Sequence, residues 1–190
     1  RRMSQFRRAD SPRKSAPQVT ADLVDRKPPF DLDAEAGVLG SMMLLPDVID
    51  DIALVLRADD FYDDAHRKLF SHMQAMHDAG QKIDPVLLAS RLNATGDYDA
   101  IGGAAFLHKI FHAVPNAAHA VYYSNIVREK ATFRSLITAS TDILREAYDE
   151  TLEAKQLLSQ AEQKIFGILD DRGSNTIVSI STVLHQAMDR

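Results

Sequence analysis

Cysteine and tryptophan are absent from this chain of 190 residues. Without cysteine, the chain cannot form disulfides, thiolate nucleophiles or cysteine-ligated zinc and iron–sulfur sites. It also has no apolar run near the roughly 18 residues that a membrane span requires, and no hydrophobic signal segment follows the basic N-terminus. We therefore expect an intracellular, cytoplasmic protein that makes no contact with a membrane.

The alternation of apolar and polar residues that marks a half-buried strand does not extend over any length of the sequence. Apolar residues instead recur at intervals of three and four, which is the pattern of helices that bury one face. The sequence therefore predicts an all-α fold, with a compact head of short helices followed by a long antiparallel helical hairpin and a linker helix.

Charge is distributed unevenly along the chain. The formal net charge is −5, but residues 1–14 contain six Lys or Arg and one Asp, so that the remainder carries −10. Such an acidic body is repelled by the phosphates of DNA, and any contact with DNA must use a local patch or the basic segment. Residues 1–29, which include four prolines, are predicted to form a basic flexible tail.

Three aspartates mark helix starts in the predicted head, which covers residues 30–115. Asp31, Asp63 and Asp84 each precede an apolar helical pattern, where a carboxylate can accept hydrogen bonds from free backbone N–H groups. Pro85 suits the first position of its helix, and glycines follow the third and fourth helices. The predicted helices are 33–44, 46–56, 64–79, 85–95 and 101–114.

A change of composition after residue 115 predicts the hairpin, residues 116–172. Residues 116–148 contain neither Pro nor Gly, which favours one long helix, and apolar residues in the following segment recur at a spacing near 3.5. Residues 173–190 are expected to form a linker and the start of a linker helix. The predicted seam inside the hairpin consists of Leu136, Ile143, Leu158 and Ile165.

The segment "DDFYDDAHRKLF", residues 59–70, concentrates carboxylates, an imidazole and aromatic rings. It could be a metal or acid–base cluster if these groups converged on one point. The alternative is a helix start, with Asp63 as N-cap and Phe61 and Tyr62 folding back as a hydrophobic staple. Because His66 shares a face with apolar residues, we favour the helix start, with His66 hydrogen-bonded to the backbone at the edge of the core.

Other candidate sites are weaker. "HKIFH" places His108 and His112 at the spacing of a zinc-binding helix, but Lys109 stands where that motif needs its glutamate base. The "GG" pair has no preceding strand, and no GxxxxGK[ST] motif occurs. We therefore predict no catalytic, cofactor-binding or metal-binding residue, and no ATP hydrolysis by this chain.

Several motifs occur in a distinctive order. They are "PPFDLDAEAGVLGSMML", "DDFYDDAHRKLFSHM" with "GQKID", "GGAAFL", "VPNAA", "YSNIVREKATFRSLI" and "STVLHQAMDR". Together they resemble the N-terminal domain and linker of the bacterial DnaB-type replicative DNA helicase, over residues 28–190. The chain departs from the family pattern at Phe30, which replaces a polar residue, and in "DAEAGVLG" and "PNAAH".

The resemblance implies a non-catalytic collar domain of a hexameric 5′ to 3′ helicase, which self-associates as dimers within a ring and recruits primase, with a helicase loader as a further partner. ATP and Mg²⁺ are then expected at a C-terminal RecA-like motor, which also makes the main contacts with DNA. By the same resemblance, the linker helix would dock on a neighbouring motor through Leu184, Ala187 and Met188.

Two other functions stay open at this point. One is a separate all-α regulatory module that binds a helicase or a primase, and a GxxxxGK[ST] segment downstream of Arg190 would exclude it. The other is an enzyme that uses a metal bound at His108 and His112, which predicts stoichiometric zinc.

Overall fold

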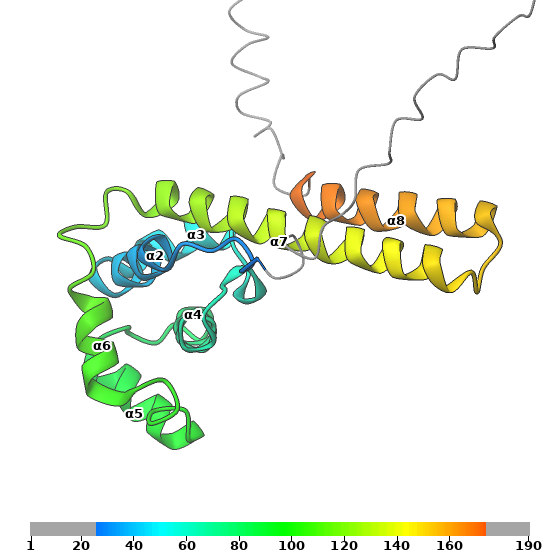
Figure 1. The fold of residues 1–190 in the computed structure, drawn as a ribbon. Helices are drawn as coiled ribbons and strands as arrows, with labels where there is room; N and C mark the ends of the chain where they lie inside the picture. The colour runs from blue at the N-terminus through cyan, green and yellow to red at the C-terminus, as the bar shows by residue number, and fades with distance from the viewer. Residues whose placement is uncertain (1–25, 174–190) are drawn as a thin grey trace, which may run out of the picture.

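The computed structural model describes residues 26–173, and Figure 1 shows their arrangement. Within these residues there are seven α-helices, two 3-10 helices and no strand, in agreement with the predicted all-α fold. None of these helices is long and apolar enough to cross a membrane. The elements are α2 (Leu32–Leu44), η1 (Pro46–Val48), α3 (Ile49–Ala53), η2 (Ala58–Asp60), α4 (Asp64–Asp78), α5 (Pro85–Thr95), α6 (Gly103–Phe111), α7 (Ala120–Asp149) and α8 (Ala154–Gly173).

Helix α2 forms the centre of the head. All of its residues from Ala34 to Met43 are buried, because α2 contacts α4, α6 and the first part of α7. A helix that is apolar on all sides is stable only when it is enclosed in this way. The remaining core side chains come from α3, α4, α5 and α6, and include Ile52, Phe70, Leu92 and Ile110.

Local capping interactions start the head helices where the sequence predicts them. The carboxylate of Asp31 accepts from the N–H of Ala34 at 2.9 Å, and that of Asp63 accepts from the N–H of His66 at 3.1 Å. Asp84 accepts from two backbone N–H groups of α5. These three predicted N-caps are confirmed.

Two glycines end their helices in the left-handed conformation. Gly80 (φ 64°) follows α4 and Gly96 (φ 80°) follows α5. At the first of them, Gly80 donates to the carbonyl of His77 and Gln81 to that of Met76, which satisfies two carbonyls that the end of a helix leaves free.

The predicted helix over residues 46–56 is shorter in the structure. It divides into the single turn η1 and the five-residue α3, and the chain then turns so that Leu56 is buried while Leu54 is exposed. The amide of Val55 donates three residues back to Ile52, which is a tighter turn than an α-helix allows. Burial of Leu56 therefore prevails over continuation of the helix.

Helix α7 belongs to both the head and the hairpin. Its first half buries Ala120, Ser124 and Val127 in the head, and its second half runs antiparallel to α8 (Figure 1). The core of the head therefore extends past residue 115, the predicted boundary, and one continuous helix links it to the hairpin.

Close packing around α2 depends on Gly40. A Cβ built at this position would lie 2.7 Å from the carbonyl oxygen of Ile110 on α6, a distance at which backbone must move. We expect Gly40→Ala to lower the free energy of unfolding by about 1–3 kcal/mol, measured by urea denaturation. Gly167→Ala is the control, because a Cβ there meets no atom within 4 Å. An equal effect of both substitutions would contradict this account of the contact.

Candidate protein-interaction surfaces

The acidic segment before α4 divides into residues with separate roles. Asp63 caps α4, and exposed Asp64 pairs with Arg67 and Lys68 on the same helix. Asp60 is turned into the protein. The carboxylates therefore do not converge on one point, and in residues 26–173 no three His, Asp or Glu side chains come together as a metal site.

His66 is held by a buried carboxylate, so the prediction that it bonds to the backbone is wrong. Its Nδ1 lies 2.7 Å from Oε2 of Glu35, which is 1% exposed. The same carboxylate accepts from the N–H groups of Tyr62, at 2.7 Å, and Asp63, at 3.3 Å. Glu35 therefore fixes the segment before α4 onto α2, across a separation of about thirty residues in the sequence.

Asp60 joins the same segment to α7. Its two carboxylate oxygens lie 2.9 and 3.0 Å from Nη1 of Arg128, and Oδ2 also accepts from the backbone N–H of Arg57. A buried carboxylate and a half-buried guanidinium that are joined by several hydrogen bonds form a more specific contact than an ion pair on the surface.

Arg134, six residues further along α7, completes the attachment. It donates to the carbonyl oxygens of Pro29 and Asp60, and its guanidinium lies 5.7 Å from the centre of the Tyr62 ring. Burial lowers the pKa of Arg134, and the nearby charges of Glu35 and Asp60 partly offset this effect. Arg134 therefore holds both the start of the head and the segment before α4.

The hydrophobic staple predicted for Phe61 and Tyr62 is wrong. Phe61 packs against Phe70 in the core, with ring centres 4.9 Å apart. Tyr62 stacks on Phe30, with ring centres 4.6 Å apart. The staple would need an apolar residue in the first turns of α4, but Arg67 occupies the fourth position of that helix.

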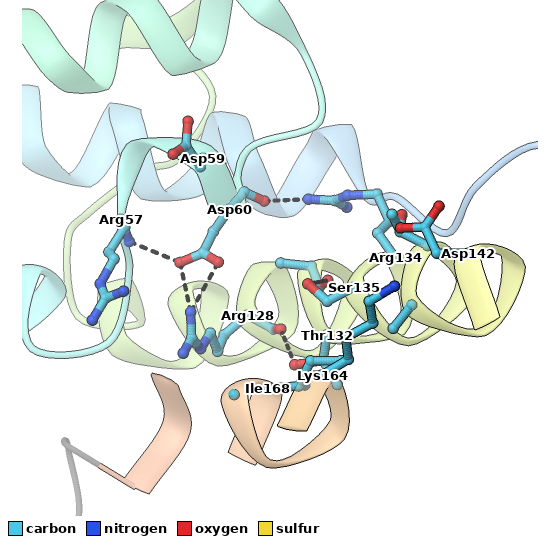
Figure 2. Close-up of a pocket in the computed structure, with 14 residues that line it drawn as sticks. Arg57, Asp59, Asp60, Arg128, Thr132, Arg134, Ser135, Asp142, Lys164 and Ile168 are labelled. Carbon is cyan, nitrogen blue, oxygen red and sulfur yellow. Dashed lines mark hydrogen bonds and ion pairs between the residues drawn. The ribbon is translucent and has the colours of Figure 1, made fainter. Parts of the chain in front are cut away.

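A cleft of about 540 Å³ opens beside this attachment. It lies between the segment around η2, the middle of α7 and the C-terminal part of α8, as Figure 2 shows. Its charged lining consists of Arg57, Arg128, Arg134 and Lys164 together with Asp59, Asp60 and Asp142. Hydroxyl groups of Thr132, Ser135 and Thr138 also line it. The cleft therefore presents charges of both signs and hydroxyl groups, and two of its cations are already held in ion pairs, Arg128 with Asp60 and Lys164 with Glu146.

The predicted hairpin seam is wrong at Leu158, which is 72% exposed. Half-buried positions on α8 recur instead at Leu157, Ala161, Lys164 and Ile168, and Lys164 pairs with Glu146 of α7 at 2.9 Å. Leu157 and Leu158 are adjacent, so the apolar period alone did not select between them.

The other three predicted seam residues differ in exposure. Ile143 is half-buried, whereas Leu136 and Ile165 each keep more than a third of their surface exposed. Their seam role stays a prediction.

The hairpin leaves many apolar side chains exposed. On α7, Phe133, Ile137, Leu144 and Tyr148 recur at helical intervals on the side away from the seam. On α8 the exposed apolar residues are Leu158, Phe166 and Leu169. We call these seven residues the apolar hairpin surface. Large apolar side chains exposed in such number are typical of interaction sites in soluble proteins.

Of two further predicted sites, one lies within the described residues and the other does not. The rings of His108 and His112 lie 4.4 Å apart at the exposed end of α6, and two imidazoles alone do not complete the ligand set of a protein zinc site. Leu184, Ala187 and Met188 lie outside the described residues, so their docking role stays a prediction.

The sequence did not predict the buried roles of three residues central to the head: Glu35, which was expected only as a first-turn acid that the helix dipole favours, Arg128 and Arg134. A signal existed for the first two. Glu35 is a charged residue inside an otherwise apolar helical pattern, and Arg128 shares a helix face with the small residues Ser124 and Ala131. A charge on an apolar face indicates a buried partner, but the pattern does not identify that partner.

The fold and its surfaces can be compared with known proteins. A family model described as the DnaB-like helicase N terminal domain matches residues 27–129. The chain is 36% identical over 171 residues to the replicative DNA helicase DnaC of Bacillus subtilis (strain 168), which covers 90% of this chain and 38% of the relative. This chain belongs to the DnaB-like helicase N-terminal domain family.

The DnaB-type domain is also 36% identical over 166 residues to the replicative DNA helicase DnaB of Mycobacterium leprae (strain TN), covering 86% of this chain and 28% of that protein. It therefore spans well under half the length of these curated relatives.

Solved structures show the same fold. The crystal structure of the N-terminal domain of DnaB helicase from Mycobacterium tuberculosis matches the DnaB-type domain with a TM-score of 0.71 and 37% identity, covering 74% of this chain and 99% of that one. A DnaB-like replicative helicase, solved in a study of its interactions with primase, matches with a TM-score of 0.61. That match has 19% identity and covers 84% of this chain and 35% of the other, so it supports the fold alone.

Proposed function

We propose that this domain is the non-catalytic collar of a hexameric replicative DNA helicase, and that it self-associates through the hairpin. The observation that carries the proposal is the apolar hairpin surface, which residues 26–173 leave uncovered. Burial of apolar area is the main favourable term in association, at about 25 cal/mol per Å². Membership of the DnaB family supports a role in DNA replication.

Other parts of the helicase would carry out the remaining steps of unwinding. ATP and Mg²⁺ would act at a C-terminal RecA-like motor, and that motor would make the main contacts with DNA. Primase is the proposed recruited partner, with a helicase loader as a second one. Family membership supports this assignment. The choice of primase follows the structural neighbour that was solved in a study of its interactions with primase. The collar would then coordinate unwinding by the helicase with the action of primase, in the cytoplasm.

A substitution on the apolar hairpin surface tests self-association. Phe166 is 55% exposed on α8, and an aromatic side chain at the centre of an interface commonly contributes about 2 kcal/mol or more. We expect Phe166→Glu to raise the dimer dissociation constant roughly thirtyfold, measured by sedimentation equilibrium.

Val86→Glu is the matched control, because Val86 is 77% exposed on α5, away from the hairpin. It should leave the dissociation constant unchanged. If the wild-type chain were a monomer at high concentration, or if both variants weakened association equally, the hairpin would not be the contact.

A further inference from the structure

His108 and His112 differ in their surroundings from the histidines of α4. His66, His72 and His77 lie 2.7, 3.0 and 3.8 Å from a carboxylate oxygen. The rings of His108 and His112 instead lie beside each other, and both residues are exposed. Within residues 26–173, neither of these two rings forms an ion pair or a side-chain hydrogen bond. Their nitrogen lone pairs are therefore accessible to a ligand from solution.

The backbone of α6 sets this arrangement of the two rings. Residues four positions apart lie on the same face of a helix, one turn from each other. His112 is the C-cap residue of α6, and its N–H donates to the carbonyl oxygen of His108 at 3.2 Å. This hydrogen bond fixes the separation of the two backbone positions, so the imidazoles are held on one face before any ligand binds.

The separation of the rings fits one metal ion bound by both. An imidazole nitrogen binds a transition metal at about 2.0–2.1 Å, which places the ring centre about 3.2 Å from the ion. Two such rings at a right angle around the ion have centres about 4.5 Å apart, whereas the tetrahedral angle of a structural zinc site gives about 5.2 Å. The ring centres here are 4.4 Å apart, which favours the right angle of a tetragonal site.

The position at the end of α6 also favours a cation. The last turn of a helix carries carbonyl groups without intrahelical partners and a partial negative charge. Residues 26–173 contain 15 Lys and Arg against 23 Asp and Glu, so the body as a whole attracts cations. Lys109 follows His108 but is rotated from it by about 100° around the helix, so its charge lies to one side of the histidine pair.

We propose that His108 and His112 together bind one divalent transition-metal ion of the class that prefers imidazole ligands, with water in the remaining coordination positions. The sequence led us to expect no metal-binding residue, because Lys109 replaces the glutamate base of the zinc-protease motif. That replacement excludes the hydrolytic chemistry of the motif, but it removes no metal ligand. The inference concerns a different surface from the apolar hairpin surface and does not depend on self-association.

Copper(II) is the probe for this site, because among first-row divalent ions it binds a given nitrogen site most tightly and prefers tetragonal geometry. Titration of the whole chain with copper(II) sulfate, followed by calorimetry, should reveal one high-affinity site. His108→Ala and His112→Ala should each raise its dissociation constant by at least about tenfold, because each removes one of two protein ligands. The matched control is His119→Ala, which removes an exposed imidazole that faces Tyr123 and should leave the constant unchanged.

The coordination of the ion and its pH dependence provide two further measurements. The electron paramagnetic resonance spectrum of bound copper(II) should be axial, as tetragonal geometry requires, and should show hyperfine splitting from two imidazole nitrogens. Each alanine variant on α6 should lose the contribution of one nitrogen. Because a metal binds only the neutral imidazole, the affinity should fall steeply as the pH is lowered from about 8 to about 5.

Four results would overturn the inference. They are no binding of copper(II) to the wild-type chain, binding that survives the combined His108→Ala and His112→Ala substitution, an equal loss in the His119→Ala control, and a stoichiometry of one ion for two chains. The last result would mean that copper(II) bridges two molecules and is not held by one helix. None of these results affects the proposed function, because self-association is measured in the presence of a chelator and without added metal.

Discussion

Replacement of Glu35 by alanine is expected to lower the free energy of unfolding by about 3 kcal/mol or more. The wild-type carboxylate accepts from two backbone N–H groups and lies 2.7 Å from Nδ1 of His66. Alanine leaves these groups without their acceptor in a buried place where water does not replace it, and it also leaves a cavity on α2. Urea denaturation followed by circular dichroism measures the change.

Two variants show whether hydrogen bonding is the cause. Glu35→Gln keeps the volume and one acceptor oxygen, but its NH₂ group faces a backbone N–H, so it should lie between wild type and alanine. Asp33→Ala removes an exposed carboxylate from the same first turn and should cost no more than about 1 kcal/mol. A loss below about 1 kcal/mol for Glu35→Ala would contradict a central role for this carboxylate.

Replacement of Asp60 by alanine is expected to lower the free energy of unfolding by about 2–4 kcal/mol. The substitution leaves the half-buried guanidinium of Arg128 without its carboxylate and the N–H of Arg57 without its acceptor. Loss of the carboxylate from a partly buried guanidinium costs more than the wild-type pair contributed. Because Asp60 joins the head to α7, the loss should appear in the global unfolding transition.

The neighbouring aspartate provides a matched control. Asp59 precedes Asp60 in the same 3-10 turn, but its side chain is exposed and points away from Arg128 in Figure 2. Asp59→Ala should therefore change stability by less than about 0.5 kcal/mol. Similar losses for the two alanine variants would mean that helix-turn propensity, and not the contact with Arg128, accounts for the effect of Asp60.

The two buried carboxylates explain how a single head is assembled. Glu35 on α2 accepts hydrogen bonds from N–H groups of the segment before α4. Asp60, which belongs to that segment, binds Arg128 on α7. Arg134 adds the carbonyl of Pro29, so that the start of the head, the segment before α4 and the long helix meet in one place. The hairpin therefore leaves the head in a fixed direction.

Local features of the fold could be predicted from the sequence because their causes lie within a few residues. Asp31, Asp63 and Asp84 cap their helices through N–H groups two or three positions away, and Gly80 and Gly96 end them through their own backbone conformation. The apolar period identified the faces of the head helices for the same reason. The order of short motifs further indicated the family, which the comparisons confirm.

Features that join distant residues were decided only in the tertiary structure. The partners of Glu35, Asp60 and Arg134 lie 27 to 105 positions away in the sequence, and nothing local specifies which charge meets which. The hairpin seam shows the same limit, since Leu157 and Leu158 fit the period equally and packing against α7 exposes Leu158.

The sequence by itself thus determined the helical class, the helix starts and the kinship with replicative helicases. The tertiary structure decided which charges are buried, where the cleft opens and which apolar face remains for a partner. The physical reason is that capping and periodicity act within a turn or two of one helix, whereas burial depends on which helices come together.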